Sequence, residues 1–348
     1  MRTQVILLAA VLGVAATLCA QQGATPVVSV KATSKGEMPL SHPVWIDGAM
    51  CDDVSNVYTR LLDKATAGGP ESLRAPIQEI TTEMMPGASF KIADAFPDWS
   101  GARTFFVHDG RVYVPAGPRH GLYVVEFASD GSVKAQTKLG LDFFVKPLHL
   151  AVFKSGEYLL VGETGRDLRT PFTAVFAADG RLLRKIYEPE DEEARQQAET
   201  GDPKYAPDPK YAPCCGGWDN EFVLDRADVT AGSDGNVYLL HGISPPLIYV
   251  ISPAGDVVRK LRIYSGHAEL RTNSIKFYAG RLAIGFDWSD DQSLIKLIDV
   301  KGSSIADYEV KESAGDSDPI LACYGPEGFT LIPRGAETKL HLVKVKLP

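Results

Sequence analysis

The sequence lacks any run of basic residues. Its 36 Lys and Arg are outnumbered by 44 Asp and Glu, which gives a formal net charge of -8. A nucleic-acid surface needs concentrated Lys and Arg, because these side chains neutralise phosphates. We therefore predict that the protein has no nucleic-acid partner.

The sequence also lacks the short motifs that mark several common classes of enzyme. It contains no phosphate-binding loop, no dinucleotide fingerprint and no Gly-x-Ser-x-Gly nucleophile elbow. Cysteine is scarce, with five residues and no Cys-x-x-Cys or His-x₃-His spacing of the kind that indicates a zinc site. No catalytic class is indicated by a motif.

The first twenty residues differ from the rest of the chain. Arg2 precedes an apolar run from Val5 to Ala16, which is too short to span a bilayer. A charged start, a short apolar run and the small residue Ala20 are typical of a cleaved secretory signal peptide. We predict a signal peptide over residues 1–20 and a secreted or periplasmic protein with no transmembrane segment after cleavage. The alternatives are an uncleaved N-terminal anchor and, less favoured, lipidation at Cys19.

The remaining cysteines fit an exported protein. If Cys19 is removed with the signal peptide, the mature chain keeps an even number of cysteines, which allows disulfides in three connectivities. These residues are Cys51, Cys214, Cys215 and Cys323.

A repeat of β-hairpins is the dominant pattern, and it is clearest from Ala227 to Ile263. Four runs rich in Val, Ile, Leu and Tyr are separated by the turn sequences Ser233-Asp234-Gly235 and Pro253-Ala254-Gly255. Asp-Gly between apolar runs is a strong hairpin signal, because a type I′ turn needs positive φ at its centre. Two such hairpins, joined by residues 242–246, predict a four-stranded antiparallel meander.

The same unit recurs along the chain. The turn glycines of the first hairpins follow one another at intervals of about 45–50 residues, and one interval is longer by about thirty. These are Gly110, Gly156, Gly235, Gly280 and Gly328, and Asn56 takes the corresponding place in the first unit. Four strands per period of this length are typical of propeller blades.

We therefore predict an all-β fold, a six-bladed β-propeller of four-stranded antiparallel blades in a single domain over residues 21–348. The strand-like run Pro26 to Ala32 has no hairpin partner nearby. We expect it to close the ring as an N-terminal strand added to the sixth blade, because a closed ring removes a free sheet edge.

The sequence of the fourth unit resembles a known type of repeat. The phrase SDGNVYLLHG, followed by PAGDVVRKL, resembles the NHL-repeat and related TolB-like six-bladed propellers of bacteria. The resemblance covers residues from about 40 to 348 and lies in the repeat pattern. It implies the fold; because such propellers include binding scaffolds, lactonases and lyases, it does not select an activity.

An insertion at about residues 188–217 accounts for the long interval. Residues 190–200 have the composition of a short exposed helix. The hexapeptide DPKYAP then occurs twice in succession, at 202–207 and 208–213. Such a proline-rich segment is either a stiff connector, which we favour, or a recognition surface.

The repeat also predicts which residues meet at the channel mouth. In a four-stranded blade, both tight turns lie on one face of the disc, and the starts of the inner strands and ends of the second strands lie on the other. Ligand sites favour the face where long loops gather. Counting seven positions on either side of the turn glycines, or one place earlier, places eight polar residues there: Arg103, His149, Glu163, Asp228, His241, Asn273, Asp287 and Arg334.

Two functions remain open. His149, Asp228 and Asn273 come from three consecutive blades, and an imidazole, a carboxylate and an amide can bind a divalent metal ion. Gluconolactonase-like propellers use acids and amides in this way, and Glu163 or Asp287 would then be the general base of a hydrolase, lactonase or lyase. We favour a monomeric binding module for an unknown small-molecule or protein ligand, in which the same residues hydrogen-bond one another in a hydrated channel. A channel mouth lined by the aromatic residues Tyr205, Tyr211 and Trp218 would support the binding module.

The propeller suggests one pairing of the cysteines. Cys51 and Cys323 fall at similar depths on the innermost strands of the first and sixth blades, which are neighbours in a closed ring. A disulfide between them would staple the closure. Cys214 and Cys215 would then form a vicinal disulfide or remain free thiols.

Overall fold

The computed structural model describes most of the predicted propeller. The described residues are 25–65, 74–97, 104–117, 121–164, 170–187, 227–242, 245–265, 270–289, 292–311 and 319–347. The predicted signal peptide, Arg103 and the whole insertion with Cys214 and Cys215 lie outside these ranges.

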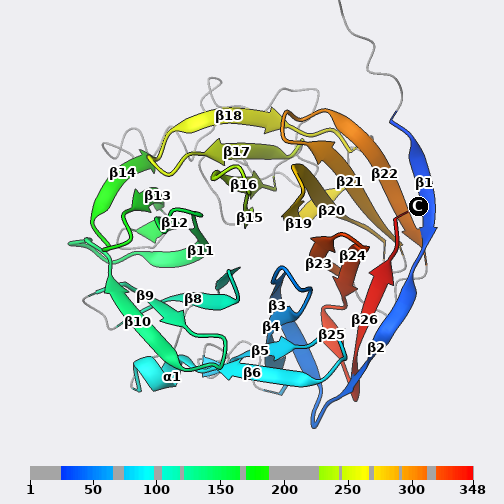
Figure 1. The fold of residues 1–348 in the computed structure, drawn as a ribbon, viewed down its shortest axis with the longest axis horizontal. Helices are drawn as coiled ribbons and strands as arrows, with labels where there is room; N and C mark the ends of the chain where they lie inside the picture. Colours follow the sequence, from blue (N-terminus) through cyan, green and yellow to red (C-terminus); the bar gives the residue numbers. More distant parts are fainter. Residues whose placement is uncertain are drawn as a thin grey trace, which may run out of the picture.

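Six β-sheets surround a central axis (Figure 1). Each sheet has a core of four antiparallel strands, and two of the sheets carry one additional strand at an edge, which confirms the predicted six-bladed β-propeller. The four-residue helix α1 (Ile92–Ala95) connects the first two blades. Within the described ranges, no helix is long and apolar enough to cross a bilayer.

The blades follow one another in chain order. The first contains β3 (Val44–Cys51), β4 (Val57–Asp63), β5 (Ile77–Ile80) and β6 (Pro86–Phe90). The second contains β7 (Phe106–His108), β8 (Arg111–Ala116), β9 (Tyr123–Phe127) and β10 (Val133–Lys138). The third contains β11 (Lys146–Val152), β12 (Tyr158–Thr164), β13 (Thr170–Phe176) and β14 (Leu182–Tyr187).

The second half of the ring repeats this arrangement. The fourth blade contains β15 (Ala227–Ala231), β16 (Val237–His241), β17 (Leu247–Ile251) and β18 (Val257–Arg262). The fifth contains β19 (Arg271–Tyr278), β20 (Arg281–Ser289), β21 (Gln292–Asp299) and β22 (Ser304–Lys311). The sixth contains β23 (Ile320–Gly325), β24 (Gly328–Ile332) and β26 (Lys339–Val345), and the short β25 (Gly335–Ala336) pairs with β3.

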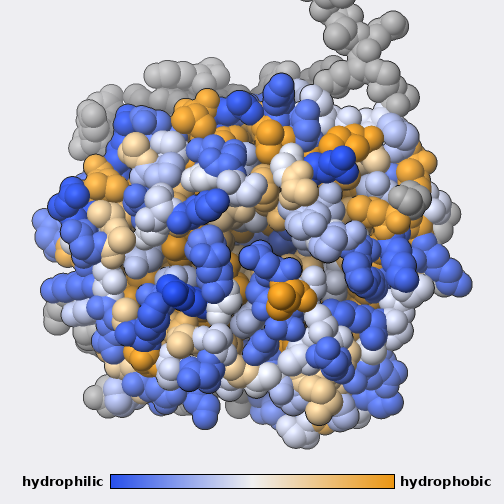
Figure 2. Space-filling view, viewed as in Figure 1, coloured by the Kyte–Doolittle hydropathy of each residue, from blue (hydrophilic) through white to orange (hydrophobic). Residues whose placement is uncertain are grey.

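The burial of each strand follows its place in the blade. The central strands β16 and β17 are buried along their whole length, because neighbouring blades cover both faces of the sheet. The outer strand β18 is exposed except at Leu261. The face in Figure 2 shows hydrophilic and hydrophobic side chains interspersed.

The predicted turns form, but in two different geometries. Asp109 and Gly110 both have positive φ, as do Ala279 and Gly280, and this is the predicted type I′ pattern. At Asp234-Gly235 only the glycine has positive φ, and its N–H donates to the Gly232 carbonyl at 3.1 Å. Here the expected type I′ turn is wrong: a wider turn ends in a left-handed glycine, and only this glycine needs a positive φ, which it adopts without steric cost.

The ring is closed by an N-terminal strand, but not by the predicted residues. β2 (Thr33–Pro39) pairs antiparallel with β26 and completes the sixth blade. The run expected to do this forms β1 (Val27–Lys31), which pairs in parallel with β22 at the outer edge of the fifth blade. The apolar composition of β1 suggested a closing strand, whereas β2 buries only Met38 and is otherwise polar.

Candidate functional site

Two cavities lie along the axis of the ring. We call the face with the tight turns the turn face and the opposite one the loop face. The loop-face cavity has a volume of about 220 Å³, far above the roughly 10–15 Å³ that one water needs. Every blade contributes to its lining, in order Asp47, Thr104, His149, Asp228, Asn273 and Arg334.

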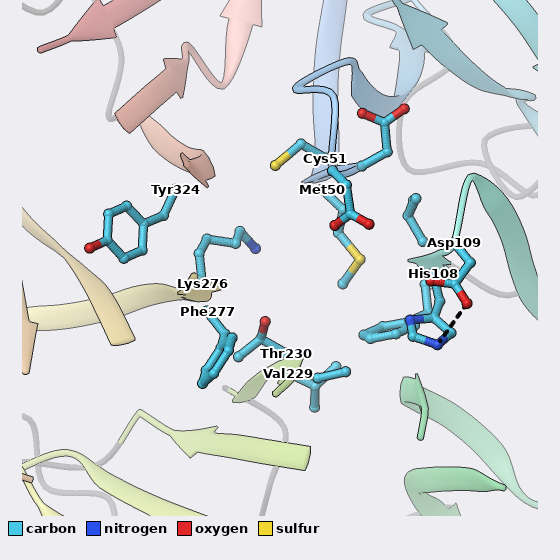
Figure 3. A pocket seen from close by; sticks show the side chains of 14 residues that line it. Met50, Cys51, His108, Asp109, Val229, Thr230, Lys276, Phe277 and Tyr324 are labelled. Carbon is cyan, nitrogen blue, oxygen red and sulfur yellow. Dashed lines mark ion pairs between the residues drawn. The ribbon is translucent and has the colours of Figure 1, made fainter. Parts of the chain in front are cut away.

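The turn-face cavity is smaller, at about 120 Å³ (Figure 3). His108, Thr230 and Tyr324 contribute to its lining from three different blades. Met50 and Lys276 line both cavities, so these two side chains lie where the cavities approach each other.

The predicted mouth residues separate into three groups. His149, Asp228, Asn273 and Arg334 are brought together in the loop-face cavity. Neither cavity is lined by the described residues Glu163 and His241: Glu163 is ion-paired with exposed Lys146 at 2.7 Å, and His241 is buried at the end of β16. Arg103 lies outside the described residues, and of Asp287 only the backbone, paired with Arg271, is described.

Three of the inner strands contain a β-bulge beside the loop-face cavity. An extra residue interrupts the register at Gly48 in β3, Leu148 in β11 and Asn273 in β19. A bulge sets two residues opposite one and re-aims their side chains. Consecutive residues therefore line the cavity at each of these places, including Leu148 with His149 and Asn273 with Ser274.

A glycine on the second strand leaves room for the bulge in β19. Gly285 lies opposite Ser274, and a Cβ atom added there would come within 2.5 Å of Ser274 Oγ and 2.7 Å of Asn273 Oδ1. The Asn273 and Ser274 side chains can therefore occupy these places at the cavity only because residue 285 is a glycine and has no side chain.

Asp228 is held by two partners from the neighbouring blade. Its Oδ2 accepts a hydrogen bond from the Ile275 N–H at 2.8 Å and lies 3.2 Å from Lys276 Nζ. The Lys276 and Asp228 side chains are only 9% and 18% exposed, so the charges compensate each other inside the ring. This pair links the inner strands of the fourth and fifth blades.

A second pair of opposite charges lies in the first blade. Asp47 of β3 pairs in register with Arg60 of β4, with Arg60 Nη1 at 3.9 Å from Asp47 Oδ2. The Arg60 side chain is 1% exposed, whereas Asp47 is 32% exposed and lines the loop-face cavity. The buried Arg60 guanidinium thus lies behind the Asp47 carboxylate, which faces the cavity.

The donors present do not fit a divalent metal ion. Asp228 Oδ2 already faces an ammonium group, and Asn273 Oδ1 accepts a hydrogen bond from Ser274 Oγ at 2.6 Å. Among the described residues, no group of three or more His, Cys, Asp or Glu is arranged to hold a metal. A metal at His149, Asp228 and Asn273 would lie next to the Lys276 ammonium, which repels a cation, and would compete with Ser274 for Asn273 Oδ1.

Sequence reasoning missed two charged residues of the cavity. Lys276 and Asp47 lie inside inner strands. Counting from the turn glycines selected one position toward the start of each inner strand and one near the end of each second strand. The signal that could have identified them is a charged residue within an apolar strand sequence: Lys276 interrupts the run Ile275 to Tyr278, and Asp47 follows Ile46. A charge in the interior of an innermost strand points to a partner or a channel, since such strands are buried.

The cysteines of the first and sixth blades lie next to each other. Cys51 packs against the apolar cluster that contains Cys323, and both are free thiols. The cluster also includes Ala322 and Leu342. Cys51 and Cys323 therefore lie close together, as predicted, but they form no disulfide bond in this structure.

Comparisons with known proteins give similarity of fold. No protein-family model and no curated protein matches the chain. A structural-genomics target described as a candidate gluconolactonase has 12% identity and a TM-score of 0.49, covering 91% of this chain and 92% of its own. YCF48 bound to D1 peptide has 8% identity and a TM-score of 0.46, covering 88% and 94%.

A protein of unknown function from Bacteroides caccae has 12% identity and a TM-score of 0.44, covering 76% of this chain and 82% of its own. Similarities at this level assign neither a family nor an activity. The pairing of the strands of this chain establishes that it is a six-bladed β-propeller.

Proposed function

We propose that the protein is a binding module that receives a small polar ligand, or a polar segment of a protein, in the loop-face cavity. The observation that carries the proposal is the construction of the cavity, to which all six blades contribute. Such convergence of polar groups in a concave site is typical of ligand-binding pockets.

The charges of the cavity support binding over catalysis. Asp228 is compensated by Lys276 and Asp47 by Arg60, so both carboxylates are held in place by partners of the protein itself. Fixed, compensated groups orient a ligand at little cost in reorganisation, which favours recognition. Glu163, a candidate general base, is ion-paired with Lys146 and does not line the cavity.

A thermal-shift screen tests this proposal. The probes are free amino acids, dicarboxylates, monosaccharides and tripeptides, and a hit is followed by calorimetry. His149→Phe replaces the imidazole with an apolar ring that can neither donate nor accept a hydrogen bond, and we expect it to weaken binding at least about tenfold, because a polar ligand loses a partner in the cavity. His42→Phe is the matched control, since His42 is exposed and does not line the cavity. Hits that bind His149→Phe as tightly as the unmodified protein would refute the loop-face site.

The alternative function is a metal-dependent hydrolase, lactonase or lyase with His149, Asp228 and Asn273 as ligands. The hydrogen bonds that Asp228 and Asn273 already accept weigh against it. Elemental analysis of protein purified without chelator separates the two functions. Stoichiometric metal that is lost in His149→Ala, together with lost turnover of a lactone, would establish the enzyme.

We propose further that the protein is exported, on the basis of the signal-like residues 1–20. N-terminal sequencing of the protein recovered from a bacterial host tests this. A mature N-terminus near Gln21 in the periplasmic or medium fraction is the expected result, and an uncleaved Met1 in the cytoplasm would contradict it.

A further inference from the structure

Two thiols meet where the ring closes. Cys51 is the last residue of β3 in the first blade, and Cys323 lies in β23 of the sixth. These are the innermost strands of the two blades. Across the boundary between the blades, Cys51 packs against the apolar cluster to which Cys323 belongs.

The two thiols differ in access. Cys323 is 2% exposed and lies in the apolar cluster, whereas Cys51 is half-buried and lines the turn-face cavity. In Figure 3 the Cys51 sulfur points toward the strand that carries Tyr324, the neighbour of Cys323 in the chain. A reagent that enters the turn-face cavity therefore reaches Cys51 before Cys323.

The surroundings also favour Cys51 as the first thiol to react. Burial raises the pKa of Cys323 well above its ordinary value, the neighbouring Cys51 side chain adds to this, and the ammonium groups of Lys35 and Lys276 oppose it. Because the thiolate is the nucleophile, the protonated Cys323 is the slower of the two.

We propose that Cys51 and Cys323 form a reversible dithiol–disulfide pair, which cross-links the first and sixth blades by exchange with a small disulfide such as oxidised glutathione. The Cys51 thiolate attacks one sulfur of the small disulfide, breaks its S–S bond and releases one thiolate. Cys323 then loses its proton to solvent, attacks the Cys51 sulfur and releases the second thiolate. One small disulfide is reduced to two thiols, and two protein thiols are oxidised to one disulfide.

The cross-link would join the first blade to the sixth, across the boundary at which the ring closes. The two cysteines are separated by most of the chain, so a disulfide between them removes a large closure entropy from the unfolded state. We expect oxidation to raise the melting temperature on the order of 5 °C. Reduction by dithiothreitol should reverse the shift.

The test starts from a Cys214→Ser, Cys215→Ser variant, in which thiols outside the pair no longer react in the mature chain. After incubation with oxidised glutathione and alkylation of remaining thiols, peptide mapping should recover a Cys51–Cys323 disulfide. The same mapping on the chain with all its cysteines should recover the same pair. Thiols that stay reduced, or a link from Cys51 to Cys214 or Cys215, would overturn the proposal.

Two single variants test the order of attack. In Cys323→Ala, one glutathione should remain attached at Cys51. In Cys51→Ala, Cys323 should react at least about tenfold more slowly, because it is buried and protonated. If either variant fails to fold, the rate of alkylation by iodoacetamide is measured for each cysteine in the unmodified protein. Faster alkylation of Cys323 than of Cys51 would overturn the assignment.

Discussion

Lys276 Nζ lies 3.2 Å from Asp228 Oδ2, and this contact joins the inner strands of two adjacent blades between the two axial cavities. The carboxylate also receives the Ile275 N–H of the same neighbouring blade. The pair therefore contributes to the cohesion of the ring and to the charge balance of the proposed binding site.

Asp228→Asn should lower the free energy of unfolding by about 3 kcal/mol, because it leaves the Lys276 ammonium buried without compensation. The double variant Asp228→Asn, Lys276→Met should be more stable than Asp228→Asn alone. Urea unfolding followed by circular dichroism measures both. Lys146→Met is the control, since Lys146 is 51% exposed in its pair with Glu163 and should cost less than about 1 kcal/mol. Equal losses in Asp228→Asn and Lys146→Met would contradict the role of burial.

Gly285→Ala should destabilise the protein by about 1–3 kcal/mol and weaken any ligand bound in the loop-face cavity, because the new Cβ overlaps Ser274 Oγ and Asn273 Oδ1. Gly325→Ala is the control, at the end of the inner strand β23, where the nearest atom to a new Cβ, Ser55 Oγ, lies at 3.6 Å. Thermal unfolding of the two variants makes the comparison. A Gly285→Ala variant as stable as Gly325→Ala would show that the bulge can shift freely.

Removal of the N-terminal strands should reveal which one closes the ring. A chain that begins at Thr33 loses β1 and uncovers only the outer edge of β22, so we expect it to remain monomeric and folded. A chain that begins at Ser41 also loses β2, which exposes the edge of β26. An unpaired edge of this kind promotes aggregation. Size-exclusion chromatography distinguishes the two chains, and a monomeric, fully stable protein beginning at Ser41 would contradict closure by β2.

The turn at Asp299 should make a pH-dependent contribution to stability. Burial tends to raise the pKa of Asp299, but the N–H groups of Ser303 and Lys301, each 2.8 Å from Oδ1, lower it below its ordinary value. A depressed pKa in the folded state stabilises the protein above the unfolded pKa of about 3.9, and this contribution is lost as the pH falls through the folded value.

Asp299→Asn should therefore be less stable than the unmodified protein at pH 7, and the difference should shrink as the pH falls through the depressed pKa of the folded state. Urea unfolding at a series of pH values measures this difference. The exposed residue Asp142 supplies the control variant Asp142→Asn, which removes the same charge. A difference between Asp299→Asn and the unmodified protein that persists unchanged into acid would exclude the charge of Asp299 as its cause.

The blades could be predicted from sequence because their signals are local. Turn glycines such as Gly110 and Gly235 adopt positive φ, and the apolar runs beside them are buried between neighbouring blades. Ring closure is a long-range relationship and has no such signal. β2 contains Gly36 and Pro39 and buries only Met38, so its pairing with β26 is not visible in its composition.

The site could be predicted only in part, for a related reason. Counting within the repeat located His149, Asp228 and Asn273, because all three lie near the starts of inner strands. It overlooked Lys276, because the spacing of turns shows neither the bulge at Asn273 nor the carboxylate on the adjacent inner strand with which the ammonium group pairs. Glu163 lies at the predicted strand end, yet its side chain pairs with Lys146 outside the cavity.

The pairing of β2 with β26 also constrains the order of folding. Lys339 and Glu37 form an ion pair between these strands at a separation of 302 residues in the chain. The sixth blade therefore cannot be completed until nearly the whole polypeptide is available, while the earlier blades consist of neighbouring hairpins that can form as they emerge. Closure of such distant contacts is slow, because loop entropy is lost before the contact is gained. We expect the last event in folding to be the joining of the two ends of the chain.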